Sequence, residues 1–120
     1  TIQFVNGNLL INGNNIPRDK IKSAKLIRCG KFELETNSFI ETLPNGISYL
    51  AVYKKRGTLK NTKKFIVPPE HFFLLGDNRD CSKDSRYLDS VGYVNYLNLV
   101  GEAQLIFFSN DTNISSLLKF

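Results

Sequence analysis

The 120-residue sequence contains 42% hydrophobic and 22% charged residues, a balance that argues against intrinsic disorder and suits a globular domain. Eight glycines and four prolines exclude a collagen or linker composition, and no apolar run approaches the roughly 20 residues of a membrane-spanning helix. The net charge of +5 is compatible with a solvated basic surface, an anionic lipid surface or a nucleic acid. Six of the sixteen basic residues lie between residues 54 and 64. We interpret this segment first as an exposed hairpin tip, and contact with anionic lipid headgroups is the next alternative.

The chain opens with two turn signals that predict antiparallel β structure. Asn6-Gly7 lies between apolar runs and Asn12-Gly13 follows closely, and Asn-Gly is the strongest short-range signal for a type I′ hairpin turn.

Thr1 occupies the first position in place of Met, which predicts a processed, truncated or engineered N-terminus.

Further strands are predicted in the middle of the chain. Residues 32–36 alternate apolar and polar side chains, and residues 38–43 give a second short candidate. Leu43-Pro44-Asn45-Gly46 predicts a turn, and residues 47–53 are rich in β-branched and aromatic residues, as a returning strand would be.

The remaining elements are also predicted as strands and loops. Phe65 to Val67 is expected to re-enter the sheet after the basic loop, and His71 to Leu75 is expected to be a strand buried on both faces. A last strand is expected from Leu99 to Phe108, before a tail from about residue 109 that is either mobile or a short helix. The expected core contains seven apolar side chains: Phe4, Leu9, Phe65, Phe72, Leu74, Phe107 and Phe108. With no repeat or boundary, the sequence predicts a single all-β domain over residues 1–120.

The most informative segment runs from Gly76 to Arg86 and reads Gly-Asp-Asn-Arg-Asp-Cys-Ser-Lys-Asp-Ser-Arg. Its opposite charges predict a salt-bridge network that fixes a loop in one conformation. An EF-hand loop is excluded because Arg79 and Cys81 occupy ligand positions, and a glycosidase carboxylate pair is disfavoured because the arginines would keep the acids ionised. We therefore expect no metal and no cofactor.

Two alternative nucleophile arrangements are weak. His71 is the only histidine, and the flanking Phe72 and Phe73 favour a packed position over a Ser/His/Asp triad. Thr1 as an N-terminal nucleophile is chemically conceivable, but a chain boundary explains it better. Cys29 and Cys81 lack metal-ligand spacing, and the sequence leaves open whether they pair or remain two thiols.

The segment from Gly76 to Arg86 resembles the last conserved motif, box E, of bacterial type I signal peptidases, which are serine endopeptidases with a Ser/Lys dyad. The approach through residues 67–75, the Leu43–Gly46 turn and residues 92–103 are also similar to that family. The resemblance implies antiparallel sheets in a partly open, barrel-like fold that is truncated at its N-terminus. It also implies that the chain begins just after the lysine motif, so the nucleophilic serine and the general-base lysine are absent and the fragment alone is inactive.

The resemblance assigns supporting roles to the motif residues. Ser82 corresponds to the hydroxyl that orients the absent base lysine, and Asp77 to an acid that pairs with an absent arginine. Asp84 and Arg86 correspond to an ion pair that stiffens the loop. The structural positions of the motif are Gly76, Asn78, Arg79, Asp80 and Ser85, and Gly76 is expected to permit a close backbone approach.

The family implies cleavage of signal peptides from exported preproteins by an enzyme anchored in the bacterial cytoplasmic (inner) membrane, with its catalytic domain on the outer or periplasmic side. The membrane contact would come from an absent N-terminal anchor, and no nucleic-acid partner is expected. Unpaired strand edges predict self-association of the truncated chain. The alternative hypothesis is a non-enzymatic β module that binds an extended peptide or a partner protein. A self-cleaving repressor protease is disfavoured because such proteins lack the Gly-Asp-Asn-Arg-Asp pattern.

Overall fold

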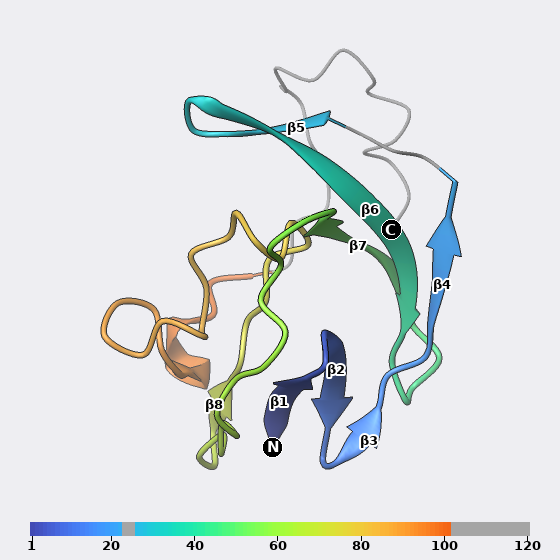
Figure 1. Cartoon of the computed structure of the whole chain (residues 1–120). Helices are drawn as coiled ribbons and strands as arrows, with labels where there is room; N and C mark the ends of the chain where they lie inside the picture. The colour runs from blue at the N-terminus through green and yellow to red at the C-terminus, as the bar shows by residue number, and fades with distance from the viewer. Residues whose placement is uncertain (23–25, 102–120) are drawn as a thin grey trace.

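The computed structural model describes residues 1–22 and 26–101, which form antiparallel sheets joined by ordered loops (Figure 1). The first sheet has the order β1-β2-β3 and contains β1 (Ile2–Val5), β2 (Asn8–Ile11) and β3 (Asn14–Asn15). Both Asn-Gly pairs form the predicted turns, with positive φ at Asn6 (50°) and Asn12 (50°), a backbone conformation that asparagine and glycine tolerate best.

The second sheet is built around one long strand, β6 (Phe32–Thr42). The start of β6 pairs with β5 (Leu26–Cys29), and its later part lies between β4 (Arg18–Ile21) and β7 (Ser48–Lys54). The sequence predicted two strands here, over residues 32–36 and 38–43, whereas the structure has one continuous strand. The 43–46 turn and the strand after it are confirmed, because Leu43 accepts a hydrogen bond from the N–H of Gly46 and β7 returns beside β6.

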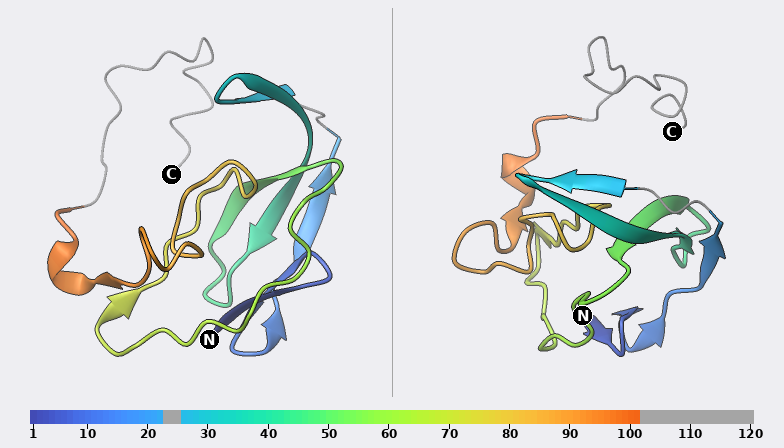
Figure 2. Two further views of the ribbon diagram at one scale, coloured as in Figure 1. Left: turned by 60° about the vertical axis from the view of Figure 1, so that its left-hand side comes forward. Right: turned by 45° about the horizontal axis from the view of Figure 1, so that its top comes forward.

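A third, two-stranded sheet pairs β8 (His71–Phe72) with β9 (Val94–Asn95), and a 3₁₀ helix, η1 (Tyr96–Asn98), follows. The two views of Figure 2 show that the β1–β3 sheet and the β5–β6 hairpin lie at opposite ends of the molecule, with the loops between them. The all-β class is confirmed, and no sheet among the described residues closes into a barrel.

The core lies where the first two sheets meet. Phe4, Leu9 and Ile16 from the first part of the chain pack with Ala51 and Tyr53 of β7. Phe65 is also buried, so three of the predicted core residues are confirmed.

The prediction of a doubly buried strand over residues 71–75 is wrong. Only His71 and Phe72 form a strand, and Phe72 and Leu74 are 44% and 45% exposed. The reason is that the backbone of Leu74 bonds to Ser85 instead of to a neighbouring strand: its N–H donates to Ser85 Oγ, and its carbonyl accepts from the Ser85 N–H.

Two other predicted strands also differ. Phe65 makes an isolated bridge to Ile2 in place of a full strand over residues 65–67. Residues 99–101 are not in a strand, while residues 102–108, with Phe107 and Phe108, and the tail from residue 109 lie outside the described residues.

Candidate functional site

The loop formed by residues 76–86, called the motif loop below, is attached to the edge of β7 by its backbone. Val52 donates its N–H to the carbonyl of Asp77 (2.8 Å), and Arg79 donates its N–H to the carbonyl of Val52 (2.9 Å). These bonds form a short parallel bridge between Val52 and Asn78. The beginning of the motif loop is therefore hydrogen-bonded to a strand that is itself part of the core.

Arg79 fixes the middle of the loop through a buried polar cluster. The Arg79 and Glu41 side chains are only 2% and 1% exposed, and Arg79 Nη2 lies 2.7 Å from Glu41 Oε2. Arg79 Nη1 also donates to the Tyr53 hydroxyl (2.8 Å), and the Tyr53 and Tyr49 hydroxyls both donate to the Glu41 carboxylate. A buried charge is tolerated only when it is paired and hydrogen-bonded in this way.

The register of β6 and β7 explains why these side chains meet. Glu41 lies directly opposite Tyr49, and Tyr53 lies further along β7 on the same face because side chains alternate along a strand. Burial and the bond to Glu41 raise the pKa of the Tyr53 hydroxyl, and burial and the Glu41 charge raise that of Tyr49. Both hydroxyls therefore stay protonated donors at neutral pH.

Asp84 and Arg86 close the end of the loop onto its beginning. The ion pair that the resemblance implies is present and bidentate: Arg86 Nε is 2.7 Å from Asp84 Oδ1, and Arg86 Nη2 is 2.8 Å from Oδ2. Asp84 Oδ2 also accepts the N–H of Gly76 (3.0 Å), and Arg86 donates to the carbonyl of Arg79. Burial alone would raise the pKa of Asp84, but the bonds from Arg86 and Gly76 outweigh it and lower that pKa.

Ser82 packs directly against Gly76. A Cβ atom built on Gly76 would lie 2.1 Å from Ser82 Oγ and 2.3 Å from Ser82 Cβ, so any larger residue would displace this serine. Gly76 therefore leaves room for the side chain of Ser82, whereas the expectation was a close approach of backbone. The Ser82 N–H donates to the carbonyl of Asn78 (2.9 Å), whereas its Oγ has no hydrogen-bond partner in residues 1–22 and 26–101.

The two remaining acids of the motif loop have different environments. Asp80 is partly buried and accepts the N–H of Lys54 (2.7 Å), the N–H of Leu59 (3.1 Å) and the hydroxyl of Thr58 (3.1 Å). Asp77 is exposed, and its Oδ1 accepts the N–H of Asn78 (2.9 Å). No cation pairs with Asp77 in the part of the chain that the structure describes, so the arginine partner that the resemblance implies is not found there.

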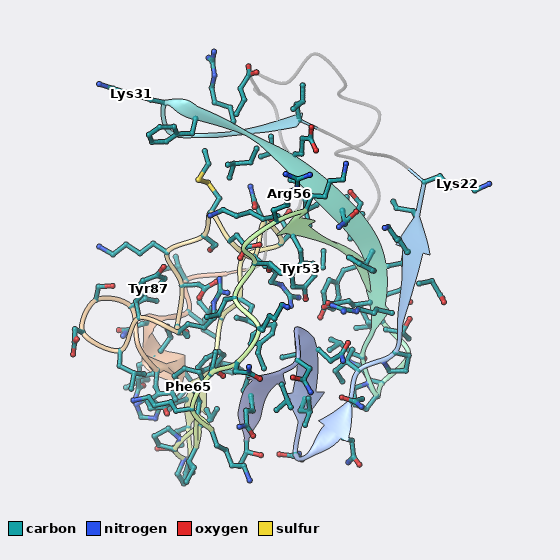
Figure 3. All side chains as sticks on the ribbon, in the orientation of Figure 1. Lys22, Lys31, Tyr53, Arg56, Phe65 and Tyr87 are labelled. Atoms are coloured by element: carbon teal, nitrogen blue, oxygen red, sulfur yellow. A yellow bond between two sulfur atoms is a disulfide. The ribbon has the colours of Figure 1, made fainter. Side chains whose placement is uncertain are left out.

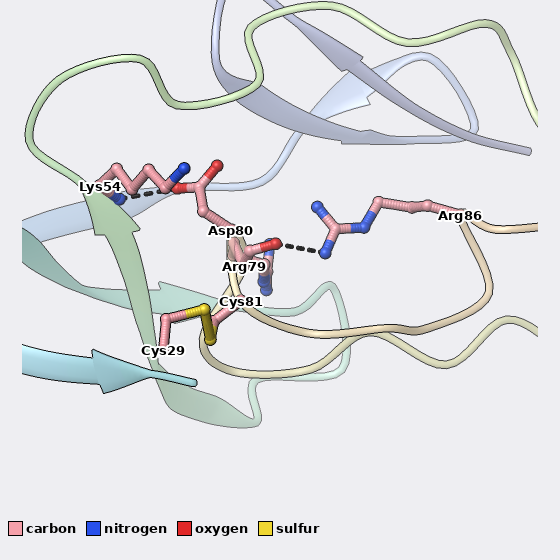
Figure 4. Close-up of a disulfide and its surroundings, with 6 residues drawn as sticks. All are labelled: Cys29, Lys54, Arg79, Asp80, Cys81 and Arg86. Carbon is pink, nitrogen blue, oxygen red and sulfur yellow. Dashed lines mark hydrogen bonds between the residues drawn. A yellow bond between two sulfur atoms is a disulfide. The ribbon is translucent and has the colours of Figure 1, made fainter. Parts of the chain in front are cut away.

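A disulfide between Cys29 and Cys81 adds a covalent attachment, which resolves the question that the sequence left open. The two Cα atoms are 5.7 Å apart, and the bond joins the end of β5 to the residue beside Ser82 (Figure 4). Figure 4 also shows the Lys54 and Asp80 contact at the end of β7 and the Arg86 contact to Arg79. The motif loop is thus held by β5, β6 and β7 together.

An apolar cleft of about 690 Å³ opens beside the motif loop. Its walls come from the first sheet, the turn after β6, β7 and the approach to the loop, and its charged lining residues are Asp77 and Arg79. The lining residues are Ile2, Leu9, Ile11, Leu43, Tyr49, Leu50, Phe73, Leu75, Gly76, Asp77 and Arg79. Gly76 is shared, because it lines the cleft and contacts Ser82.

Other candidate centres are not supported by the geometry. His71 lies on β8, where its Nδ1 is 2.7 Å from the carbonyl of Pro69, and no Ser or Asp side chain bonds to its ring within the described ranges. In those ranges no three His, Cys, Asp or Glu side chains are grouped to hold a metal ion. No helix in the described part of the chain is long and apolar enough to cross a membrane.

The profile of the signal peptidase, peptidase S26 family matches residues 1–108, and the chain belongs to this family. The chain is 35% identical to Signal peptidase I of Rickettsia typhi, an alignment that covers 98% of this chain and 47% of the relative.

Other relatives carry the same name. The chain is 34% identical to Signal peptidase I of Rickettsia akari over 93% of this chain and 42% of the relative, and 44% identical to that of Rickettsia bellii over 59% and 26%. The chain therefore spans about half the length or less of these curated relatives. No solved structure matches.

Sequence reasoning found the motif loop but missed its partners. Glu41, Tyr49 and Tyr53 were not singled out, because only the register of β6 and β7 brings them under Arg79. The alternate positions of β6 on the side of Glu41 include Glu35 and Asn37, so the strand pattern gives no signal that Glu41 is buried.

Proposed function

We propose that this chain forms part of the catalytic domain of a signal peptidase that removes signal peptides from exported preproteins, in an enzyme anchored in the bacterial inner membrane. In this proposal Ser82 is a positioning residue that orients a general-base lysine, and it does not attack the substrate. The observation that carries the proposal is the Ser82 hydroxyl itself, which is fixed against Gly76 with no partner of its own in the described residues.

The proposed roles of the other motif residues follow from their contacts. Asp84, Arg86 and the Arg79 cluster support the loop, and Asp77 is left free to pair with a cation outside the described residues. A lysine acts as a base only when its pKa is depressed, which an apolar cleft such as the one beside Gly76 would favour. We further propose that the 120 residues alone cleave no preprotein, and that the single domain spans all of them.

Kinetics of a signal peptidase that contains these residues test this assignment. Ser82→Ala is expected to lower kcat about 10- to 100-fold with little change in KM, because one hydrogen bond to the base is lost. The pH dependence of kcat/KM should also shift, since the environment of the base changes, and a purely structural residue would not shift it. Ser90→Ala, at an exposed position beyond the motif loop, is the matched control.

Two results would contradict the proposal. An unchanged kcat and pH profile for Ser82→Ala would remove Ser82 from the catalytic arrangement. Cleavage of a preprotein by the isolated chain, lost on Ser82→Ala, would instead make Ser82 the nucleophile.

A further inference from the structure

The positive charge of the chain is concentrated in residues 54–64, called the basic segment here. It contains six basic and no acidic residues, so the other 109 residues hold ten basic and eleven acidic ones and carry a net charge of −1. The net charge of +5 is therefore a property of one segment and not of the whole surface.

The backbone of the basic segment is fixed at both ends. Lys60 and Thr62 bond to the first hairpin: the Gly7 N–H donates to the carbonyl of Lys60 (2.7 Å), and the Thr62 N–H donates to that of Phe4 (3.0 Å). At its start, the Asp80 carboxylate binds the N–H groups of Lys54 and Leu59. The segment is exposed, as predicted, but it is not a hairpin tip, because it lies along β1 and Phe65 after it bridges Ile2 instead of β7. Because this backbone is already ordered, little conformational entropy of the segment is lost when a partner binds it.

Most of the charged side chains on the segment are exposed and unpaired. Lys55 pairs with Glu35 at 3.1 Å. Asp80 lies near the segment, but its carboxylate accepts the backbone N–H groups of Lys54 and Leu59 and forms no ion pair with the lysines. The others that are exposed, namely Arg56, Lys60, Lys63 and Lys64, have no ion pair with any described residue. Lys63 lies over the ring of Phe65, with its Nζ 5.7 Å from the ring centre. These four cations are therefore available to bind an anionic surface.

The apolar residues beside the cations indicate which kind of anionic surface fits. Leu59 is 47% exposed within the segment, and Ile66 is 69% exposed just beyond it. A bilayer surface can accept both charged and apolar side chains at headgroup depth. Single-stranded nucleic acid needs exposed aromatic rings for stacking, and the aromatic residue here, Phe65, is only 3% exposed.

We propose that the basic segment, with Leu59 and Ile66, is a docking surface for an anionic phospholipid bilayer. The surface lies along β1 and is joined to the motif loop by Asp80, so docking would orient that loop relative to the membrane plane. Figure 3 shows Arg56 and Phe65 along this part of the molecule, while Lys22 and Lys31 extend away from it. The proposal does not depend on the role of Ser82, because lipid binding is measured without peptide cleavage.

Sedimentation with lipid vesicles tests this surface. We expect the chain to bind vesicles of phosphatidylcholine with about 30% phosphatidylglycerol, not to bind phosphatidylcholine alone, and to dissociate as salt screens the charges. Replacing Lys60, Lys63 and Lys64 by glutamate should weaken binding by more than about 100-fold, since each cation near the surface contributes about fivefold and each new carboxylate is repelled. The matched control replaces the exposed Lys20, Lys22 and Lys31 by glutamate and changes the net charge by the same amount. Circular dichroism checks that both variants are folded.

Three results would overturn the proposal. One is absence of binding to the anionic vesicles. Another is an equal loss in the two triple variants, which would assign binding to net charge alone. The third is tighter binding to a single-stranded oligonucleotide than to vesicles, unaffected by Leu59→Ser and Ile66→Ser, which would indicate a nucleic-acid surface.

Discussion

Replacing Arg79 by methionine is expected to lower the free energy of unfolding by about 3 to 5 kcal/mol. The substitution leaves the Glu41 carboxylate, which is 1% exposed, without its cation, and it releases the motif loop from β6 and β7. Because a domain of this size is stable by only about 5 to 15 kcal/mol, a large part of the stability would be lost. Urea unfolding followed by circular dichroism measures the change.

Two variants separate this effect from a general effect of removing charge. Lys55→Met breaks the exposed pair with Glu35, whose side chains are 54% and 68% exposed, and should cost less than about 1 kcal/mol. The double variant Glu41→Leu with Arg79→Met removes both buried charges and should recover part of the loss, because the Tyr49 and Tyr53 hydroxyls then lose their acceptor. A loss below about 1 kcal/mol for Arg79→Met would mean that the cluster does not hold the loop.

Removal of the Cys29–Cys81 disulfide is expected to have a comparable effect. The two cysteines are separated by 52 residues, and closing a loop of that length stabilises the folded state by about 4 kcal/mol in the chain-entropy treatment. The measurement is thermal unfolding of the wild type and of Cys29→Ala with Cys81→Ala, each with and without a reductant. The reductant should lower the Tm of the wild type to that of the variant and leave the variant unchanged.

The location of this bond also bears on compartment. Stable disulfides form outside the cytoplasm, which agrees with the outer or periplasmic side that the family resemblance implies for the catalytic domain. Thiol titration of the unfolded, unreduced chain provides the control and should detect no free thiol. Two titratable thiols in the oxidised protein, or a Tm that does not respond to reductant, would contradict the pairing.

Local signals in the sequence were sufficient for the short-range elements. The Asn6-Gly7 and Asn12-Gly13 turns and the return of β7 after the 43–46 turn depend on neighbouring residues, and all form as predicted. The motif loop was found in the same way, because its charges lie within eleven consecutive residues.

The elements that were mispredicted depend on contacts between distant residues. Residues 71–75 have the composition of a buried strand, but the backbone of Leu74 bonds to Ser85, eleven residues further along the chain. The basic segment is exposed as predicted, but it is not the predicted hairpin tip, because Thr62 bonds to Phe4 across 58 residues. Pairings over such separations follow from the assembled fold, and no local pattern encodes them.

The central claim is that side-chain contacts hold the motif loop in one conformation before any substrate or base is present. Native-state hydrogen exchange of the chain tests this claim directly, because protection reports the free energy needed to open each amide. If the claim is right, the N–H groups of Arg79 and Ser82 exchange about as slowly as those of Phe39 and Ala51 in the paired part of β6 and β7. Exchange as fast as that of the exposed turn at residues 87–91 would contradict it.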